Sequence, residues 1–232
     1  MAKCFTEWTV LPHDPIEKHS ESLWSVSGKM PGGNQRRMAL ARRADGKLVI
    51  HNAIALSDEE MSEIEAFGTP GYLVVPNSFH RMDALIYKQR YPKLEVLCPH
   101  AARKKVGELV PVSGSMAEMP KDAIVDMFHI RGMKEREGVI VVKGGGQSAV
   151  VFNDAVLNVP KGKGIVDWFM APTGTVAVPR FTRWMLAKST AEMKEHLQEL
   201  AKTPGLRQLV PGHGPVVPEA ASDALSAAAA RL

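Results

Sequence analysis

Short apolar runs separated by turn-forming residues dominate the first two thirds of the chain. The clearest is residues 72–75 (YLVV), a run short and β-branched enough to predict a buried strand. Pro76-Asn77 ends this strand, because proline removes a ladder donor and both residues favour turns. Apolar residues then recur at helical spacing across 82–89. The pattern predicts a strand, a tight turn and a helix, with His80 near the start of the helix.

Turn and capping signals divide the rest of the chain. Asp45-Gly46 lies between two strand-like runs, which is a strong hairpin signal. The glycines of residues 144–146 mark a second turn. Ser57 and Ser189 each begin the S-x-x-E pattern of a helix capping box. Further strands are predicted at residues 23–26, 37–42, 47–54, 94–98, 124–130, 139–142, 148–152 and 206–210, and helices at residues 58–67, 99–106, 181–187, 189–204 and 218–232.

Length and composition indicate a single globular domain over residues 1–232. The chain is 45% apolar and 23% charged, which is ordinary for a soluble globular protein. It is also long enough to bury a full core without disulfides. The net charge of +4 is small and its lysines and arginines are scattered, so nucleic acid is not an expected partner. Arg36-Arg37 and Arg42-Arg43 are predicted to form a solvated strand face.

Cys4 and Cys98 are the only cysteines and lie far apart in sequence. Without a CxxC or Cys/His finger spacing, a structural zinc site of the cysteine type is not expected. The first ten residues lack the apolar core of a signal peptide, and no apolar run reaches the roughly 18 residues of a membrane span. We therefore expect a cytoplasmic protein with no membrane partner. The sequence leaves a homo-oligomer open.

Three groups suited to metal binding follow predicted buried strands, namely His80, Asp154 and His213. Ligands gather at the carboxyl ends of strands in α/β folds, and two imidazoles with one carboxylate are a common ligand set for zinc or iron. Each residue alone has a simpler interpretation, as a surface histidine at a helix start, a turn former and a loop residue. His213 has the sharpest context, because Gly212 and Gly214 let the backbone turn and bring the imidazole close to a ligand.

Other reactive or bulky residues favour structural roles. His51 is expected to pack within its strand. Cys98 and His100 could suggest a thiol nucleophile, but neighbouring positions at a strand end usually point apart. Trp184 and Met185 fit the core stripe of a helix, and residues 168–170 (Trp-Phe-Met) are expected to pack a loop or a subunit contact.

The run L-V-P-G-H-G-P-V at 209–216 is similar to the last metal-binding motif of the metallo-β-lactamase-fold superfamily. V-V-F-N-D-A-V at 150–156 resembles the superfamily strand whose terminal aspartate bridges two metals. Residues 72–92 occupy the place of its H-x-H-x-D-H loop. The resemblance covers about residues 20–225 and implies an α+β fold, the four-layer αββα sandwich of the metallo-β-lactamase type.

The sequence departs from the superfamily motifs at two places. P-N-S-F-H-R replaces H-x-H-x-D-H, so Asn77 or Ser78 stands where the family has a histidine, and His80 takes either the aspartate or the last histidine position. Met133 stands in the ligand position of the middle motif, with His129 nearby in the preceding strand. The resemblance therefore implies a depleted site: one metal position has lost its ligands, and the other keeps His80, Asp154 and His213.

Two functions remain open. The first is a metallo-hydrolase-like protein in which one divalent metal, zinc or else iron or manganese, activates water against an ester, amide or phosphoester. The alternative is a non-catalytic, small-molecule-binding or structural member of the superfamily that has lost the metal site and needs no cofactor. The small-molecule substrate or ligand is not defined by the sequence, because this fold serves many chemistries.

Overall fold

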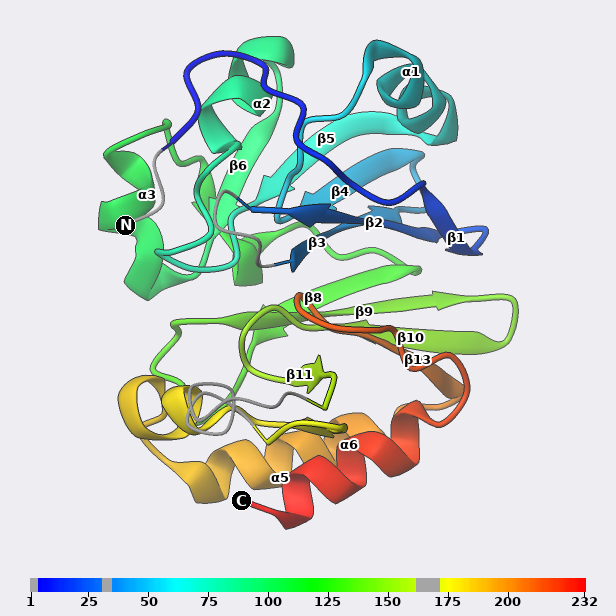
Figure 1. Cartoon of the computed structure of the whole chain (residues 1–232), viewed down its shortest axis with the longest axis vertical. Helices are drawn as coiled ribbons and strands as arrows, with labels where there is room; N and C mark the ends of the chain where they lie inside the picture. The colour runs from blue at the N-terminus through cyan, green and yellow to red at the C-terminus, as the bar shows by residue number, and fades with distance from the viewer. Residues whose placement is uncertain (1–3, 31–34, 162–171) are drawn as a thin grey trace. The chain divides into compact units, whose positions relative to one another are not determined.

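The computed structural model describes residues 4–30, 35–161 and 172–232. The chain divides into two compact units, Met1–Met127 and Phe128–Leu232, each with its own sheet and hydrophobic core (Figure 1). The expectation of a single domain stays a prediction. The expected packing of Trp168, Phe169 and Met170 concerns residues outside the described ranges.

The sheet of the first unit changes from antiparallel to parallel along its width. Its seven strands follow chain order, with the first four antiparallel and the last four, from β4 onward, parallel. Because parallel neighbours end at the same edge, the residues that follow β4, β5 and β6 share one side of this sheet. The strands are β1 (Glu17–Ser20), β2 (Leu23–Lys29), β3 (Gln35–Arg42), β4 (Lys47–His51), β5 (Thr69–Val74), β6 (Glu95–Cys98) and β7 (Gly114–Ser115).

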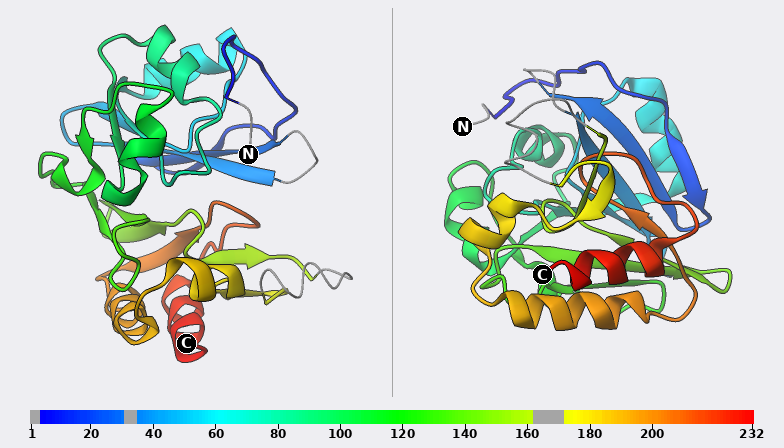
Figure 2. Two further views of the ribbon diagram at one scale, coloured as in Figure 1. Left: turned by 90° about the vertical axis from the view of Figure 1, so that its left-hand side faces the viewer. Right: turned by 60° about the horizontal axis from the view of Figure 1, so that its bottom comes forward.

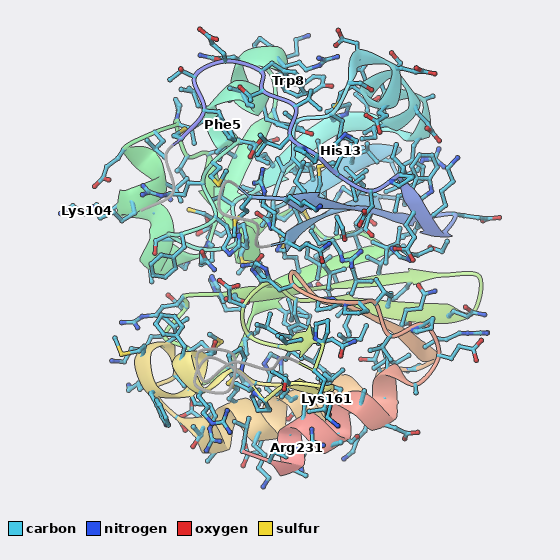
Figure 3. All side chains as sticks on the ribbon, in the orientation of Figure 1. Phe5, Trp8, His13, Lys104, Lys161 and Arg231 are labelled. Atoms are coloured by element: carbon cyan, nitrogen blue, oxygen red, sulfur yellow. The ribbon has the colours of Figure 1, made fainter. Side chains whose placement is uncertain are left out.

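The helices of the first unit pack on its sheet and share one core with it (Figure 1). They are α1 (Asp58–Phe67), α2 (Ala84–Arg90), α3 (Arg103–Gly107) and the 3₁₀ turns η1 (His100–Ala102) and η2 (Met116–Glu118). Both halves of the capping box that Ser57 predicts are present at the start of α1. The N-terminal segment completes the core with Phe5 and Trp8 (Figure 3), and the Trp8 indole donates to the Leu56 carbonyl at 2.8 Å.

The second unit has a four-stranded sheet in the order β13-β10-β9-β8 and a small two-stranded sheet of β11 and β12. Strands β9 and β10 form the predicted hairpin, with Gly145 and Gly146 both at positive φ, as a two-residue turn of type I′ requires. Strand β13 returns parallel to β10. The strands are β8 (Val125–His129), β9 (Gly138–Gly144), β10 (Gln147–Val151), β11 (Leu157–Val159), β12 (Thr175–Ala177) and β13 (Leu206–Val210).

Helices α5 (Thr190–Ala201) and α6 (Ala221–Ala230) lie side by side in the second unit (Figure 2). Ser189 caps α5 as predicted, with its hydroxyl accepting from the Glu192 amide at 3.2 Å. The prediction for Trp184 and Met185 was wrong. They lie on the short π-helical turn η3 (Thr182–Leu186) and are 62% and 63% exposed. A five-residue turn has one buried position, taken by Thr182, and leaves no room for a core stripe.

The prediction of a solvated arginine face was also wrong, except for Arg42. Arg36, Arg37 and Arg43 are all buried. Arg36 contacts the Asp83 carboxylate at 2.5 Å, Arg37 donates to the Ser25 hydroxyl at 3.1 Å, and Arg43 donates to the Pro120 carbonyl at 3.0 Å. A guanidinium is tolerated inside a protein when acceptors meet its donors. These acceptors come from distant parts of the sequence and leave no local signal.

Within the described ranges, every helix is too short or too polar to serve as a membrane span.

We expect the stability of the protein to fall as the pH is lowered from 7 towards 5. Burial lowers the pKa of His196 and of His19 below the ordinary histidine value. Below pH about 6.5 these two histidines bind protons in the unfolded chain but stay neutral in the folded protein. The free energy of unfolding therefore decreases with falling pH until the lowered pKa values of the folded protein are reached. His196 also accepts the Arg131 amide at 2.9 Å through Nδ1.

Thermal unfolding between pH 7 and 5 measures this loss. His196→Asn places an amide oxygen near the position of Nδ1, so it keeps an acceptor and should reduce the pH dependence. A wild-type melting temperature that does not change over this range would contradict the assignment.

Candidate functional site

The carboxyl edge of the first sheet gathers polar residues. Asn52 follows β4, residues 77–80 follow β5, and His100 follows β6. The backbone amide of Asn52 donates to the Val74 carbonyl at 3.0 Å, which joins the ends of β4 and β5. The parallel pairing therefore places Asn52 beside the loop that carries His80.

His80 lies in this loop and not at the start of the helix. Asn77 is buried, and its side-chain Oδ1 accepts from the backbone amides of Phe79 at 2.9 Å and His80 at 3.1 Å. This side-chain turn delays helix α2, which begins only at Ala84. Asn77 thus shapes the backbone that presents His80.

The imidazole of His80 is oriented by Asn52, which the sequence analysis did not single out. Asn52 Nδ2 donates to the Arg37 carbonyl at 2.9 Å, so Oδ1 of the amide faces His80 Nδ1 at 3.2 Å. Because Oδ1 is an acceptor, Nδ1 carries the proton and Nε2 keeps its lone pair. Asn52 has a φ of 57°, a conformation that asparagine tolerates better than most residues. The contact therefore fixes the tautomer and the orientation of the His80 ring.

The second unit brings Asp154 and His213 into contact. β10 and β13 are parallel neighbours, so the loops that follow them lie at the same edge. His213 Nε2 lies 3.2 Å from Asp154 Oδ1, and both side chains are about one-fifth exposed. Two of the three residues predicted from the sequence are thus adjacent within one unit.

Both glycines beside His213 are required by close packing. A Cβ on Gly214 would lie 1.7 Å from the Asn158 carbonyl oxygen, and the φ of Gly214 is +91°. A Cβ on Gly212 would lie 2.8 Å from Asn153 Oδ1 and 2.9 Å from its Cα. The two glycines therefore let the His213 loop pack closely against the segment that follows β10 and contains Asp154.

The backbone around Asp154 is held from two sides. Thr182 Oγ1 donates to the Asp154 carbonyl at 2.8 Å, and the next amide, of Ala155, donates to Glu137 Oε1 at 2.6 Å. Both Thr182 and Glu137 are buried. Sequence reasoning missed them because they lie 28 and 18 residues from their partners and belong to no local motif. They fix the backbone from which the Asp154 side chain projects.

The remaining candidates lie apart from these contacts. Met133 is fully buried in the core of the second unit, and His129 is the last residue of β8, as expected. Ser78 lines a pocket of the first unit together with His80. Burial raises the pKa of Cys98 to about 11, which favours the protonated thiol at neutral pH over the nucleophilic thiolate.

The residues at these strand ends suit a divalent cation. Imidazole and carboxylate are usual ligands of zinc, iron and manganese. Two ligand atoms on a tetrahedral zinc ion lie roughly 3.3–3.5 Å apart, given metal–ligand bonds of about 2.0–2.2 Å. The 3.2 Å between His213 Nε2 and Asp154 Oδ1 is close to this separation. It also suits a hydrogen bond, so the same two atoms can share either a proton or a metal ion.

We expect Gly214→Ala to destabilise the protein, since the new Cβ would collide with the Asn158 carbonyl and the backbone would be strained at positive φ. A strained conformation of this kind costs about 1–3 kcal/mol. Gly107→Ala is the matched control, because a Cβ at the end of α3 meets nothing within 4 Å. Urea unfolding of both variants gives the comparison. Equal stabilities would contradict the close packing.

Comparisons with known proteins identify the fold through solved structures and not through sequence matches. No protein-family model and no curated protein matches the sequence. Several solved structures match over nearly the whole chain. The DIM-1 metallo-β-lactamase has a TM-score of 0.64 at 11% identity and covers 95% of this chain and 99% of its own.

Two further metallo-β-lactamases give similar values. FIM-1 from Pseudomonas aeruginosa, in a mono-zinc form, has a TM-score of 0.60 at 13% identity over 96% of both chains. The enzyme from Hirschia baltica has a TM-score of 0.55 at 12% identity over 94% of this chain and 98% of its own. The α+β class predicted from the sequence is confirmed, and the chain has the metallo-β-lactamase fold.

Proposed function

We propose that the protein is a hydrolase that holds one divalent metal ion through His80, Asp154 and His213 and acts on a small molecule in the cytoplasm. The observation that carries the proposal is the contact between His213 Nε2 and Asp154 Oδ1 at 3.2 Å. Their loops are fixed by glycine packing and by Thr182, so the two ligand atoms are held near each other before any ion binds. A site arranged in advance needs little ordering on binding.

His80 is proposed as the third ligand. Its Nδ1 donates to Asn52 Oδ1, which orients the ring, and Nε2 is the nitrogen that we assign to the ion. A metal-binding histidine usually donates its other ring N–H to a neighbouring acceptor, which fixes the ring and raises its basicity. The likeness to FIM-1 supports a single ion, since that metallo-β-lactamase is known in a mono-zinc form.

One ion suffices for the proposed chemistry. A divalent metal with three protein ligands supplies Lewis acidity that activates water near neutral pH. His80 and His213 contribute neutral nitrogen donors, and Asp154 contributes one negative charge. A second ion is not expected, because Asn77 is used to hold the loop and Met133 is buried in the core with a soft thioether that suits hard cations poorly.

The alternative is a binding protein without catalysis. One observation favours it: the contact between His213 and Asp154 is also a satisfactory hydrogen bond without an ion. In that case the pair holds two loops together, and a ligand binds elsewhere. A single substitution separates the two functions.

We expect His213→Ala to reduce the metal content of protein purified without chelator from about one ion per chain to a small fraction, since it removes one of three protein ligands. The melting temperature of the metal-free protein should change little, because His213 lies in a partly exposed loop. His100→Ala is the control, as this exposed histidine follows β6 and is not a proposed ligand. Elemental analysis and thermal unfolding give both measurements.

The binding alternative predicts the reverse result for the same variant. Wild type and His213→Ala would both be metal-free, and the variant would lose the contact that joins the two loops, which costs about 0.5–1.5 kcal/mol of stability. That pair of results would refute the hydrolase proposal.

A second prediction concerns Asn52. Asn52→Gly keeps the positive φ of the backbone but removes the acceptor that orients His80. Loss of such a partner typically lowers metal affinity by about 10- to 100-fold, which competition with a chromogenic chelator measures. Nitrogen NMR of the metal-free protein gives an independent check: His80 should carry its proton on Nδ1 in the wild type and on a mixture of both nitrogens in the variant. An unchanged tautomer would contradict this role.

A further inference from the structure

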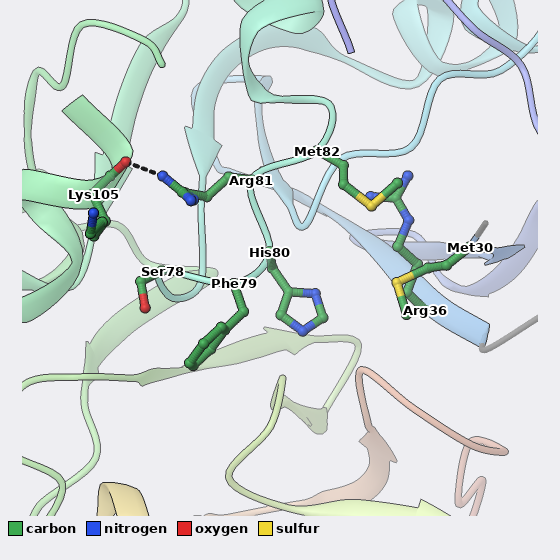
Figure 4. A pocket seen from close by; sticks show the side chains of 8 residues that line it. All are labelled: Met30, Arg36, Ser78, Phe79, His80, Arg81, Met82 and Lys105. Carbon is green, nitrogen blue, oxygen red and sulfur yellow. Dashed lines mark hydrogen bonds between the residues drawn. The ribbon is translucent and has the colours of Figure 1, made fainter. Parts of the chain in front are cut away.

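The first unit contains a pocket with a volume of about 280 Å³ beside His80. Figure 4 shows Arg81 and Lys105 on one side of it, Met30 and Met82 on the other, and His80 between them. Ligand pockets usually measure about 300–1,000 Å³, so this one suits a small molecule.

The surface that the pocket presents is mostly apolar. Met30, Met82 and Phe79 supply it, and the Phe79 ring is unusually exposed for an aromatic side chain, at 56%. Thioethers adapt their shape to a ligand and make favourable contacts with aromatic rings. An apolar body, above all a flat ring, therefore fits between the methionines and Phe79.

The charges of the lining are all positive and come from Arg36, Arg81 and Lys105. Arg36 is neutralised, because its guanidinium contacts the buried Asp83 carboxylate at 2.5 Å. Among the described residues, Arg81 and Lys105 both contact one carboxylate outside the lining, that of Glu108.

Glu108 lies 2.9 Å from the Lys105 ammonium and 3.7 Å from the Arg81 guanidinium. Within the part of the chain that the structure describes, two cations at the pocket thus face one carboxylate, and the excess of about one positive charge favours a ligand with one acidic group.

Arg81 is held in place for such a group. Its Nη1 donates to the Lys105 backbone carbonyl, and its side chain is only 12% exposed (Figure 4). A guanidinium has five N–H donors, so this bond leaves others for a ligand. A planar, pre-oriented fork of donors matches a carboxylate.

We propose that this pocket binds a small organic acid, with its carboxylate at Arg81 and Lys105 and its apolar body against Phe79, Met30 and Met82. Because His80 forms part of the wall, the same acid is the substrate class of the enzyme; that second statement rests on the proposed function, whereas the binding of the acid does not.

The test measures binding of three matched probes to the full-length protein after treatment with EDTA, by calorimetry at low ionic strength. 1-Naphthoate carries the negative charge, 1-naphthamide is its neutral analogue, and 1-naphthylmethylammonium carries a positive charge. We expect the acid to bind about tenfold more tightly than the amide, as a charge-assisted contact exceeds a neutral one, and the cation to bind least. An acid that binds no more tightly than the amide overturns the proposal.

Neighbouring lysines on α3 provide a matched pair of variants. Lys105→Met should weaken the affinity for naphthoate by about two- to fivefold, which is the usual effect of an exposed charge. The affinity for the amide should not change. Lys104→Met removes the same charge from a side chain that points away from the molecule (Figure 3) and should change neither affinity. Equal effects of the two variants would show only non-specific charge attraction and overturn the assignment.

Two further variants test the walls. Arg81→Met should weaken the binding of naphthoate more than Lys105→Met does, and Phe79→Ser should weaken the binding of the acid and of the amide equally.

Repeating the titrations with added zinc tests this proposal separately from the proposed metal site. If the protein binds naphthoate but takes up no metal, the acid-binding proposal is supported and the hydrolase proposal is refuted. If the protein binds metal but not naphthoate, only the acid-binding proposal is refuted.

Discussion

The close approach of two loops in the second unit is the constraint on which the candidate site depends. Parallel pairing of β10 with β13 brings the loops to one edge, and Gly212 and Gly214 let them touch where any Cβ would collide with Asn153 or Asn158. The contact between His213 and Asp154 follows from this packing. Its geometry is thus set by backbone and sterics, which act whether or not an ion is bound.

In the first unit, the side-chain amides of two asparagines hold the loop and the ring of His80 in place. Asn77 accepts two backbone amides to shape the loop, and Asn52 fixes the ring of His80 through Nδ1. A single histidine is thereby held in a defined tautomer and orientation. A binding site of any kind needs side chains that are held in one geometry in this way.

The sequence predicts best what local patterns determine. The strands that become β5, β6 and β13, the capping box of Ser57 and the glycines around His213 follow from periodicity, capping and turn chemistry. Pairings between distant residues could not be predicted. Asn52 contacts His80, which lies 28 residues away in sequence, and Arg36 contacts Asp83, which lies 47 residues away. The residues next to Asn52 and Arg36 in the sequence therefore do not indicate that these two side chains are buried. Trp184 and Met185 show the converse error, since helical spacing alone did not reveal that η3 is too short to bury them.

Crystals grown with zinc and measured with X-rays on both sides of the zinc absorption edge would show whether His80, Asp154 and His213 hold one ion. We expect one anomalous peak about 2.0–2.2 Å from His80 Nε2, His213 Nε2 and an Asp154 oxygen. Two peaks about 3.5–4 Å apart, or no peak and an intact hydrogen bond between His213 and Asp154, would contradict it.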